Sequence, residues 1–427
     1  MITNLKQFAI DLKSPYLLSL LLISLVPLFP DYITFFLILA ALIPFYKDMK
    51  NRQAKPTINT IGKLLFIYCG YLTLTCIIST DPFQSALTVA MWWFMLIVYI
   101  IVSNLLTDRD RLDAFLMCIT TVAGIVGIIA MIQSFLNTVF GIEIAGVWSW
   151  LDTIVFRYVP FNLSLQTFPK RAYATFANPN MLAQYLVMVA PFVVCFNFMD
   201  RRHSMRLYNR ICMILTFGGV MFSFSRGGYL AVICLAIILI LLNAKKRFST
   251  VLLYVAAALL FIPQDVYNRL TTLGASGRTR IWAQALESIS QRPLFGYGAG
   301  TEPASNIFRG IGMNAPHAHN IALQLLLEGG IPALMLMTAI AVVIIRYGLR
   351  LIRNGYRASF WVGFALCGFV MVVTLHGLVD YPLTIPRLIA IFVMLLAIAD
   401  RSIRIYRPTN YGRLKFPQQT PKKKRIT

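Results

Sequence analysis

Apolar stretches about as long as a membrane span recur along the chain, with short polar loops between them. An α-helix needs roughly 20 residues to cross a hydrocarbon core about 30 Å thick. Runs near that length occupy residues 15–30, 31–46, 62–80, 86–106, 113–138, 181–198, 208–225, 227–243, 248–263, 330–348, 358–377 and 384–400. The pattern predicts an all-α integral membrane protein with about twelve transmembrane helices.

Two of these boundaries rest on helix length. A single helix over residues 208–243 would measure about 54 Å, and Ser225-Arg226-Gly227-Gly228 supplies a turn midway. Residues 15–46 divide in the same way at Pro30-Asp31. The composition agrees with a membrane protein, since 58% of residues are hydrophobic, 13% are charged and the mean hydropathy is +0.70. These values exclude an ordinary soluble domain.

The basic residues of the loops predict an orientation. Short loops rich in Lys and Arg stay on the cytoplasmic side, and each even-numbered predicted span is followed by such a loop. This places both termini in the cytoplasm and puts Arg226, Arg278, His317 and His319 on the outer face. The basic residues of the inner loops are Lys47, Lys50, Arg52, Lys55, Arg109, Arg111, Arg201, Arg202, Arg206, Arg210, Lys245, Lys246, Arg247, Arg346, Arg350, Arg353 and Arg357.

Much of the formal net charge of +23 is therefore a topology signal, and it does not indicate a nucleic-acid partner. The basic tail, residues 401–427, is expected to lie on anionic lipid headgroups in the cytoplasm. No cleavable signal peptide is evident before the first span. All seven cysteines fall inside predicted spans, so they argue neither for disulfides nor for a zinc site.

Two predicted outer loops are too long to be simple connectors. They cover residues 139–180 and 264–329, and loops of this size are usually functional or disordered. We expect them to form the active site of a polytopic membrane domain over residues 1–400. The alternative for the first loop is a passive aromatic belt at the membrane interface. Its aromatic and basic residues are Trp148, Trp150, Arg157, Tyr158, Lys170 and Arg171.

The second loop contains an amphipathic helical pattern after Gly277. We expect this helix to lie at the membrane interface. Its apolar face at helical spacing is Trp282, Ala285, Leu286 and Ile289. Farther on, residues 295–300 contain three glycines, but no strand precedes them, so they predict a flexible turn rather than a nucleotide site.

Arg278 and Arg280 fall in the first turn of that helix, next to the positive end of the helix dipole. An anion bound there would offset the unfavourable placement, and the helix N-terminus would help to bind it. Contact of both arginines with lipid phosphates is the alternative.

Two of the four histidines stand at the start of another predicted helix. His317 and His319 precede Asn320, and Gly329-Gly330 breaks the helix before a membrane span. The pair suggests proton transfer or ligand binding, whereas a metal site is disfavoured because no Cys or acidic cluster accompanies it in the sequence. Simple helix capping is the other interpretation.

Arg226 lies near the outer end of two adjoining spans. An arginine at membrane depth is normally paired or directed at a polar cavity, although it could also extend to the outer headgroups. Asp380 lies on the same predicted face and could be its partner.

Together these motifs resemble those of the O-antigen ligase and polymerase superfamily, over roughly residues 60–400. The resemblance implies a twelve-helix, metal-independent glycosyltransferase that needs no cofactor. Its implied partners are an undecaprenyl-diphosphate-linked glycan donor, a lipid A-core or glycan acceptor, and membrane lipids. The matching motifs are Thr175-Phe176-Ala177-Asn178-Pro179-Asn180, Ser225-Arg226-Gly227-Gly228, Gly277-Arg278 with Trp282 and Pro293, and His319-Asn320 with Glu328-Gly329-Gly330.

The resemblance implies that transfer takes place at the outer face of the inner membrane, with His319, Arg278 and Arg226 as catalytic residues. It favours His319 over His317 and Arg278 over Arg280. The arginines would hold the diphosphate, and a neutral His319 would accept the proton of the acceptor hydroxyl. Further candidate substrate-binding residues are His317, Arg280, Arg171, Asn178, Asn180, Trp282 and Asp380.

Three functions remain open from the sequence. A ligase attaches the glycan to lipid A-core, whereas a polymerase joins carrier-linked repeat units. A transporter of lipid-linked glycans, the third, could also have twelve spans, but the charged residues singled out here cluster at one face and no internal repeat is evident.

Overall fold

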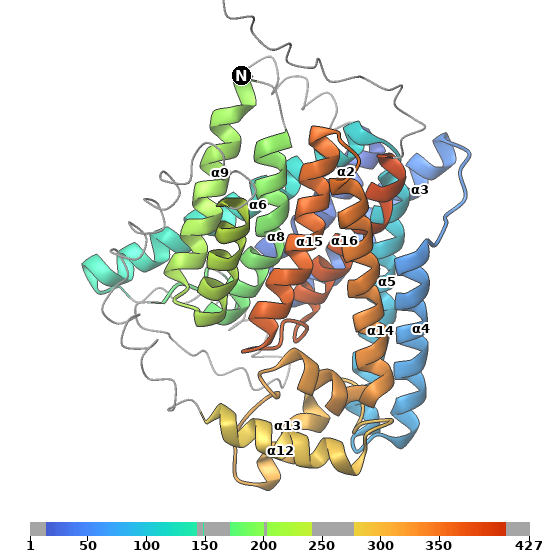
Figure 1. The fold of residues 1–427 in the computed structure, drawn as a ribbon, viewed down its shortest axis with the longest axis vertical. Helices are drawn as coiled ribbons and strands as arrows, with labels where there is room; N and C mark the ends of the chain where they lie inside the picture. The colour runs from blue at the N-terminus through green and yellow to red at the C-terminus, as the bar shows by residue number, and fades with distance from the viewer. Residues whose placement is uncertain (1–13, 143–147, 149–170, 200–202, 241–276, 407–427) are drawn as a thin grey trace, which may run out of the picture.

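The computed structural model describes residues 14–142, 148, 171–199, 203–240 and 277–406 of the 427-residue chain. Within these residues every regular element is a helix (Figure 1), so the predicted all-α class is confirmed. The N-terminal part comprises α2 (Pro15–Ser24), η1 (Val26–Leu28), α3 (Asp31–Asn51), α4 (Thr60–Thr75), η2 (Cys76–Ile78), α5 (Pro82–Leu105) and α6 (Arg109–Phe140).

The C-terminal part contributes the helices that surround the site. One helix over Arg226–Ile240 carries no label in Figure 1. The others are α8 (Pro179–Met199), α9 (His203–Phe222), α12 (Arg278–Gln291), α13 (Thr301–Gly310), α14 (Ile321–Ile352), α15 (Arg357–Gly377) and α16 (Pro386–Ile405).

Seven helices in the described residues are long and apolar enough to cross a membrane, namely α3, α4 with η2, α5, α6, α8, α14 and α15. Two shorter apolar helices cover Pro15–Leu28 and Arg226–Ile240. A helix lies at each predicted span except 248–263, which falls outside the described residues. The protein therefore has the helices of a multi-pass membrane protein, while the count of twelve crossings stays a prediction.

The core of the bundle lies around α8 and α16. Nearly every residue of both helices is buried, including polar Gln184 and Asp400. Helices that are apolar all round are typical of such interior positions. Helices α5, α14 and α15 pack around them.

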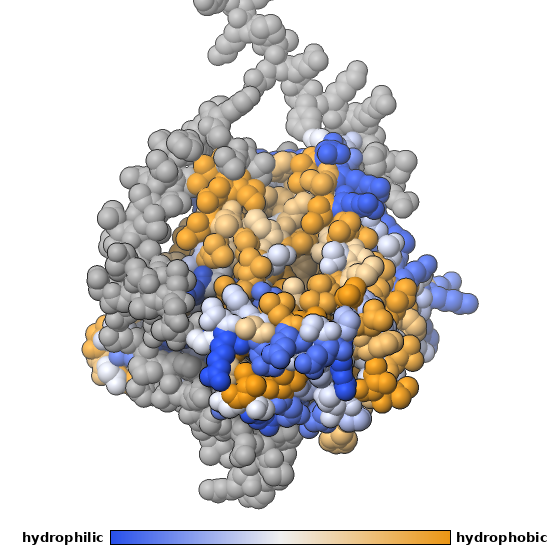
Figure 2. All heavy atoms as spheres, turned by 60° about the horizontal axis from the view of Figure 1, so that its bottom comes forward, coloured by the Kyte–Doolittle hydropathy of each residue, from blue (hydrophilic) through white to orange (hydrophobic). Residues whose placement is uncertain are grey.

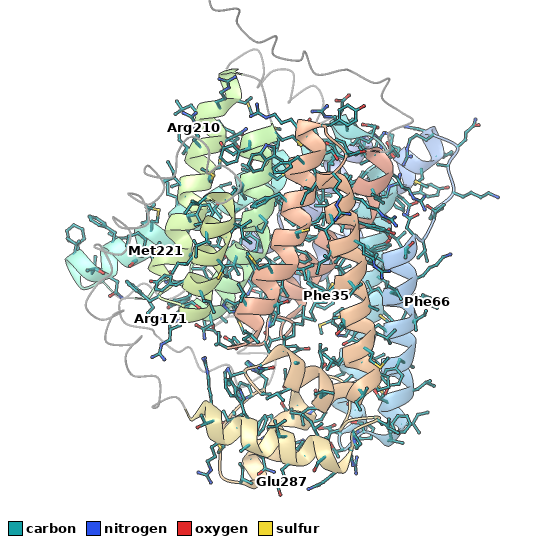
Figure 3. All side chains as sticks on the ribbon, viewed as in Figure 1. Phe35, Phe66, Arg171, Arg210, Met221 and Glu287 are labelled. Carbon is teal, nitrogen blue, oxygen red and sulfur yellow. The ribbon has the colours of Figure 1, made fainter. Side chains whose placement is uncertain are left out.

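The two ends of the bundle differ in character. Arg210 on α9 lies at one end, whereas Arg171 and Glu287 lie at the other (Figure 3). The second end carries α12 and α13, which run across it (Figure 1). Polar side chains gather over this end, with apolar side chains on the helices around it (Figure 2). The arrangement agrees with the separation of basic loops in the sequence, although the side of the membrane on which each end lies stays a prediction.

Helix α14 confirms the predicted break. Gly329 and Gly330 have non-helical backbone angles, so a short helix from Ile321 to Glu328 precedes the membrane-spanning part. The φ of Gly330 is +65°, and a Cβ there would lie 2.4 Å from the carbonyl oxygen of Leu294. A side chain at this position would collide with that backbone, so glycine is required.

The glycine-rich segment 295–300 is not the flexible turn that the sequence predicted. Residues 296–300 are buried, and the segment pairs with the break in α14. Tyr297 N donates to Leu327 O at 2.6 Å, and Gly298 N donates to Glu328 O at 3.2 Å. Glycine allows the two backbones to approach closely here. The segment thereby packs against the end of the short helix from Ile321 to Glu328.

The amphipathic helix α12 begins at Arg278 as predicted, and three of the four residues of its predicted apolar face pack inward, all but Leu286. Ile281 and Ala285 are buried, whereas Leu286, which we predicted on the apolar face, is 58% exposed. Trp282 and Ile289 are partly buried against the same small core as Phe308 of α13. This face of α12 is buried because it packs against α13 and the short helix from Ile321 to Glu328.

Candidate active site

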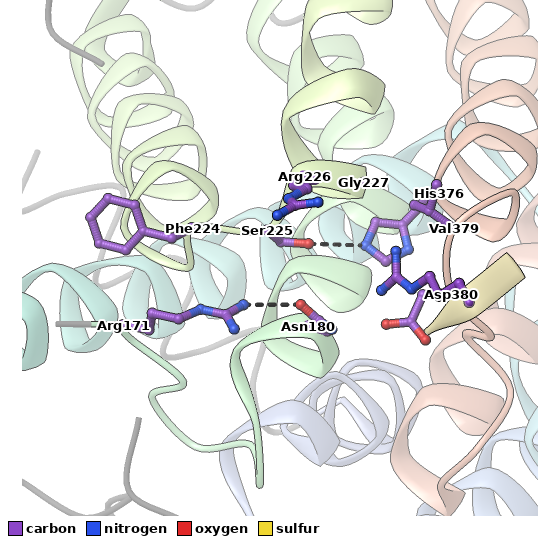
Figure 4. A pocket seen from close by; sticks show the side chains of 10 residues that line it. Arg171, Asn180, Phe224, Ser225, Arg226, Gly227, His376, Val379 and Asp380 are labelled. Atoms are coloured by element: carbon purple, nitrogen blue, oxygen red, sulfur yellow. Dashed lines mark hydrogen bonds between the residues drawn. The ribbon is translucent and has the colours of Figure 1, made fainter. Parts of the chain in front are cut away.

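Four separate segments meet at one cavity of about 180 Å³ at the end of the bundle that carries α12 (Figure 4). Three of its lining residues are arginines, and one is a carboxylate, so its potential is positive and favours an anion. The lining residues are Arg171, Asn180, Phe224, Ser225, Arg226, Gly227, Arg278, His376, Val379 and Asp380. Five of the predicted site residues, Arg171, Asn180, Arg226, Arg278 and Asp380, are thereby brought together.

The turn between α9 and the next helix positions Arg226. Ser225 O accepts from Tyr229 N at 2.9 Å, which begins that helix, and Arg226 is its first residue. Phe224 just before it has a φ of +51°, an unusual value for a residue with a side chain. Gly227 contacts α15 and the loop after it so closely that an added Cβ would lie 2.7 Å from Val379 Cγ2.

Arg278 enters the cavity from the other side of the site, as the first residue of α12. Its neighbour Gly277 has a φ of +64°, which turns the chain into the helix. Arg280 is exposed and donates to Ile311 O at 3.3 Å, outside the cavity. The structure therefore separates the two arginines that the sequence placed together, and Arg278 is the one that faces the site.

Residues at the start of α8 complete the anion-binding side. Arg171 donates to Asn180 Oδ1 at 3.0 Å and to Ser223 O at 3.0 Å, and both Arg171 and Asn180 line the cavity. Asn178, predicted as a substrate contact, caps α8 by accepting from the backbone N of Asn180 and Met181. Its amide oxygen is used by the helix, which is a common role for Asn at this position.

His319 forms a hydrogen bond with Asp380, the residue that connects the histidine turn to the cavity. The distance from His319 Nδ1 to Asp380 Oδ1 is 3.1 Å. A carboxylate can only accept, so Nδ1 carries the proton and Nε2 is left as a proton acceptor in the neutral ring. This is the arrangement by which a carboxylate orients a histidine base.

The sequence suggested Arg226 as the partner of Asp380. In the structure, the Asp380 carboxylate contacts His319, His317 at 3.7 Å and the backbone N of Tyr381. Burial would raise the pKa of the Asp380 carboxyl, but the hydrogen bond from His319 and the nearby histidines hold it below its usual range. Asp380 is therefore ionised at neutral pH, and it lines the same cavity as Arg226.

His317 is buried beside the same carboxylate. Its Nδ1 accepts from the backbone N of His319 at 3.2 Å, and the centres of the two rings are 4.2 Å apart. Burial lowers the pKa of His317 to about 4, with His319 and Arg278 acting in the same direction. A neutral, hydrogen-bonded His317 supports the shape of the turn.

Trp282 contacts this turn rather than the cavity. Its Nε1 donates to Ala318 O at 3.0 Å, and Ala318 lies between the two histidines. Trp282, predicted as a substrate contact, is therefore not among the lining residues of the cavity. Its hydrogen bond connects α12 to the turn that bears His317 and His319.

His376 is a lining residue that the sequence reasoning missed. It is 2% exposed on α15, its Nε2 lies 3.5 Å from Ser225 Oγ, and Figure 4 shows its ring beside Ser225. A histidine within an otherwise apolar span is a signal of a polar site, and this signal could have identified it.

A metal ion is the other ligand that this cluster could hold. His317, His319 and Asp380 each offer one ligand atom, and these atoms lie within 4.8 Å of one another. The sequence showed no acidic residue near the histidines, because Asp380 joins them only in the fold. However, Arg278 disfavours the protonated form of His317, and the same positive charge opposes binding of a cation. Metal independence is therefore part of the proposal below.

Comparisons with known proteins match the segment that carries most of these residues. Residues 211–338 match the model of the O-antigen ligase family, a range that includes Arg226, Arg278 and His319. The chain is also 38% identical over 101 residues to the O-antigen ligase of Pseudomonas aeruginosa, a match that covers 23% of this chain and 24% of that protein. The matched region thus spans about a quarter of the length of the curated relative. These matches confirm the resemblance inferred from the motifs and identify the chain as similar to the O-antigen ligase family through residues 211–338.

Proposed function

We propose that the protein is an O-antigen ligase-type glycosyltransferase. It transfers a glycan from undecaprenyl diphosphate to a hydroxyl group of lipid A-core, at the outer face of the bacterial inner membrane. The described residues of the two predicted outer segments, among them 171–180 and 277–329, form its active site together with Arg226, His376 and Asp380, while residues 143–147, 149–170 and 264–276 of those segments lie outside the described residues.

The arginines of the cavity suit the donor. A glycosyl diphosphate already carries its leaving group, so the enzyme has to stabilise the negative charge that grows on the diphosphate as the glycosidic bond breaks. Arg226 and Arg278 come from separate helix starts and line one cavity. A guanidinium binds phosphate oxygens in a bidentate manner and is always charged, so this pair is suited to hold the diphosphate.

The histidine suits the acceptor. As the acceptor oxygen bonds to the anomeric carbon, its hydroxyl proton passes to Nε2 of His319. Asp380 keeps Nδ1 protonated and stabilises the imidazolium that results, since it accepts from Nδ1 at 3.1 Å. The carrier diphosphate leaves with the electrons of the broken bond, and its charge stays on the arginines.

One observation carries the proposal. Asp380 both lines the arginine cavity and binds the candidate base, so the charge-stabilising and proton-accepting groups adjoin each other at one site. A transporter needs no such pairing of a base with an anion site at one end of its bundle. The relative from Pseudomonas aeruginosa supports the ligase among the enzyme alternatives.

The test is reconstitution of the purified protein in lipid vesicles with carrier-linked glycan and lipid A-core. We expect glycan covalently attached to lipid A-core and free carrier diphosphate. Longer carrier-linked chains instead would identify a polymerase, and glycan that crosses the bilayer without a new bond would identify a transporter. The same assay after treatment with a chelator should give the same rate, whereas loss of activity that Zn²⁺ restores would assign the histidine cluster to a metal.

A further inference from the structure

The motif Glu328-Gly329-Gly330 is not used by the proposed chemistry, yet Glu328 is one of the most deeply buried acidic residues described. Glu328 is 1% exposed at the end of the outer half of α14, and Gln324, one turn earlier, is 0% exposed. Gln324 Nε2 donates to Glu328 Oε1 at 2.9 Å. Burial of a carboxyl group costs free energy unless the group is hydrogen-bonded. The surroundings of Glu328 should therefore show why a carboxyl group is placed here.

Gln324 reaches the histidine turn with its other amide atom. Its Oε1 accepts from the backbone N of Ala318 at 2.9 Å. Trp282 binds the carbonyl of the same residue, so both backbone polar groups of Ala318 are held by side chains. His319, the next residue, has a φ of +49°, a conformation that persists in residues with side chains only where the surroundings impose it.

Glu328 also reaches the segment that carries Asp380. The Tyr381 hydroxyl and the Glu328 carboxyl are both buried and interact with each other, and the backbone N of Tyr381 donates to Asp380 Oδ1 at 2.9 Å. Burial raises the pKa of the Tyr381 hydroxyl, and the Glu328 carboxyl raises it further. The hydroxyl therefore keeps its proton.

We propose that Gln324, Glu328 and Tyr381 form a buried positioning cluster that sets the geometry between His319 and Asp380. One arm, through Gln324, fixes the turn that bears His319, and the other, through Tyr381, fixes the residue beside Asp380. Glu328 joins the two arms and is not among the residues that line the cavity, so it acts through the pair and not on substrate. The inference rests on the proposed function, because the pair matters only if His319 is the base.

Tyr381→Phe is the sharpest variant, since it removes one hydroxyl and leaves the ring. Tyr99→Phe is its matched control, because Tyr99 is likewise a buried tyrosine whose hydroxyl interacts with a buried carboxyl group, that of Asp400. Asp400 lies 14 residues into α16, about 20 Å along the helix from its start near the site. The two substitutions should disturb the packing of the protein to a similar extent, but only one of them touches the cluster.

The experiment measures transfer from carrier-linked glycan to lipid A-core by the reconstituted protein. We expect Tyr381→Phe to lower kcat roughly 10- to 100-fold, the usual effect of a small misplacement of reacting groups, with the KM for the donor unchanged. Tyr99→Phe should keep the wild-type kcat. In an Asp380→Asn background, Tyr381→Phe should cost little more, because the pair through which it acts is already lost.

Gln324→Met provides a second variant that keeps the side-chain length and removes the other arm, with the same expected result. Three results would overturn the positioning role. The first is a wild-type kcat in both Tyr381→Phe and Gln324→Met, and the second is an equal reduction of kcat in Tyr381→Phe and Tyr99→Phe. The third is a reduction of kcat by Tyr381→Phe that is as large in the Asp380→Asn background as in the wild type. If Tyr381→Phe and Gln324→Met both fail to accumulate as folded protein while Tyr99→Phe folds, the cluster contributes to stability alone. That result would also overturn the positioning role. Absence of transfer by the wild-type protein would instead reject the proposed function.

Discussion

His319 and Asp380 are 61 positions apart in the sequence, and their side chains are joined by a hydrogen bond of 3.1 Å. The bond connects the turn before α14 with the loop between α15 and α16, and Asp380 places it against the arginine cavity. In the proposed mechanism, the pair connects proton acceptance with anion binding at one end of the helix bundle.

Asp380→Asn should lower turnover about 10²- to 10⁴-fold, the contribution typical of acid–base catalysis. An amide cannot hold His319 in one tautomer, because it offers both a donor and an acceptor. The measurement is kcat at saturating donor, beside equilibrium binding of the donor, which should persist because the arginines remain. Glu302→Gln, an exposed carboxyl-to-amide change on α13, is the control. Wild-type turnover in Asp380→Asn would remove the carboxylate from the mechanism.

Arg226→Lys and Arg278→Lys should each weaken donor binding by about 10- to 150-fold, since a lost hydrogen bond to a charged group costs about 1.5–3 kcal/mol. Lysine keeps the charge but loses the bidentate geometry. The control is Arg309→Lys, because Arg309 is exposed on α13 and pairs with Glu302. Donor affinity equal to that of the wild type in both cavity variants would argue against a diphosphate held by these arginines.

His317→Gln should leave the acidic side of the pH profile in place. Because burial lowers the pKa of His317 to about 4, this histidine gains a proton only as the pH falls toward 4 and is neutral from pH 5 to 8. A loss of activity as the pH falls within that range therefore has to come from another group. The check is kcat against pH for the variant and the wild type. Disappearance of the acid limb in His317→Gln would make His317 the base.

Labelling from outside the cell tests the predicted orientation. With the seven native cysteines replaced, Glu287→Cys on the exposed face of α12 should react with an impermeant thiol reagent in intact spheroplasts. Arg353→Cys, exposed just after α14, should react only after lysis. The reverse pattern would place the candidate active site in the cytoplasm.

Much of the fold could be predicted because membrane helices are encoded locally, in runs of apolar residues and in the glycines that interrupt them. The break at Gly329-Gly330 was predictable because one helix from Asn320 to the end of that span would be too long for the membrane. The contact of Tyr297 with Leu327 was not, because no periodic pattern specifies which distant backbone a glycine-rich segment will pair with. The same limit explains why Ile281 was left out of the predicted apolar face of α12 and Leu286 was included, since burial on this helix depends on α13.

In the site, too, residues marked by local sequence motifs could be predicted, whereas contacts between distant segments could not. Arg226, Arg278 and His319 were predictable because charged or titratable groups at the ends of apolar helices are costly and because their motifs resemble a known family. The partner of Asp380 depends on how three loops meet, so the sequence suggested Arg226 where the structure places His319. His376 was missed although its position in an apolar span signals a polar site, because its partner Ser225 lies 151 positions away and only the fold brings the two together.

The central claim is that His319 takes the proton of the acceptor hydroxyl while the arginines hold the donor. The most direct measurement compares the rate of transfer to lipid A-core with donor binding in purified His319→Ala and wild-type protein. The account predicts turnover reduced by about 10²- to 10⁴-fold and donor binding close to that of the wild type. Near-normal turnover in His319→Ala, with the acid limb of the pH profile unchanged, would contradict it.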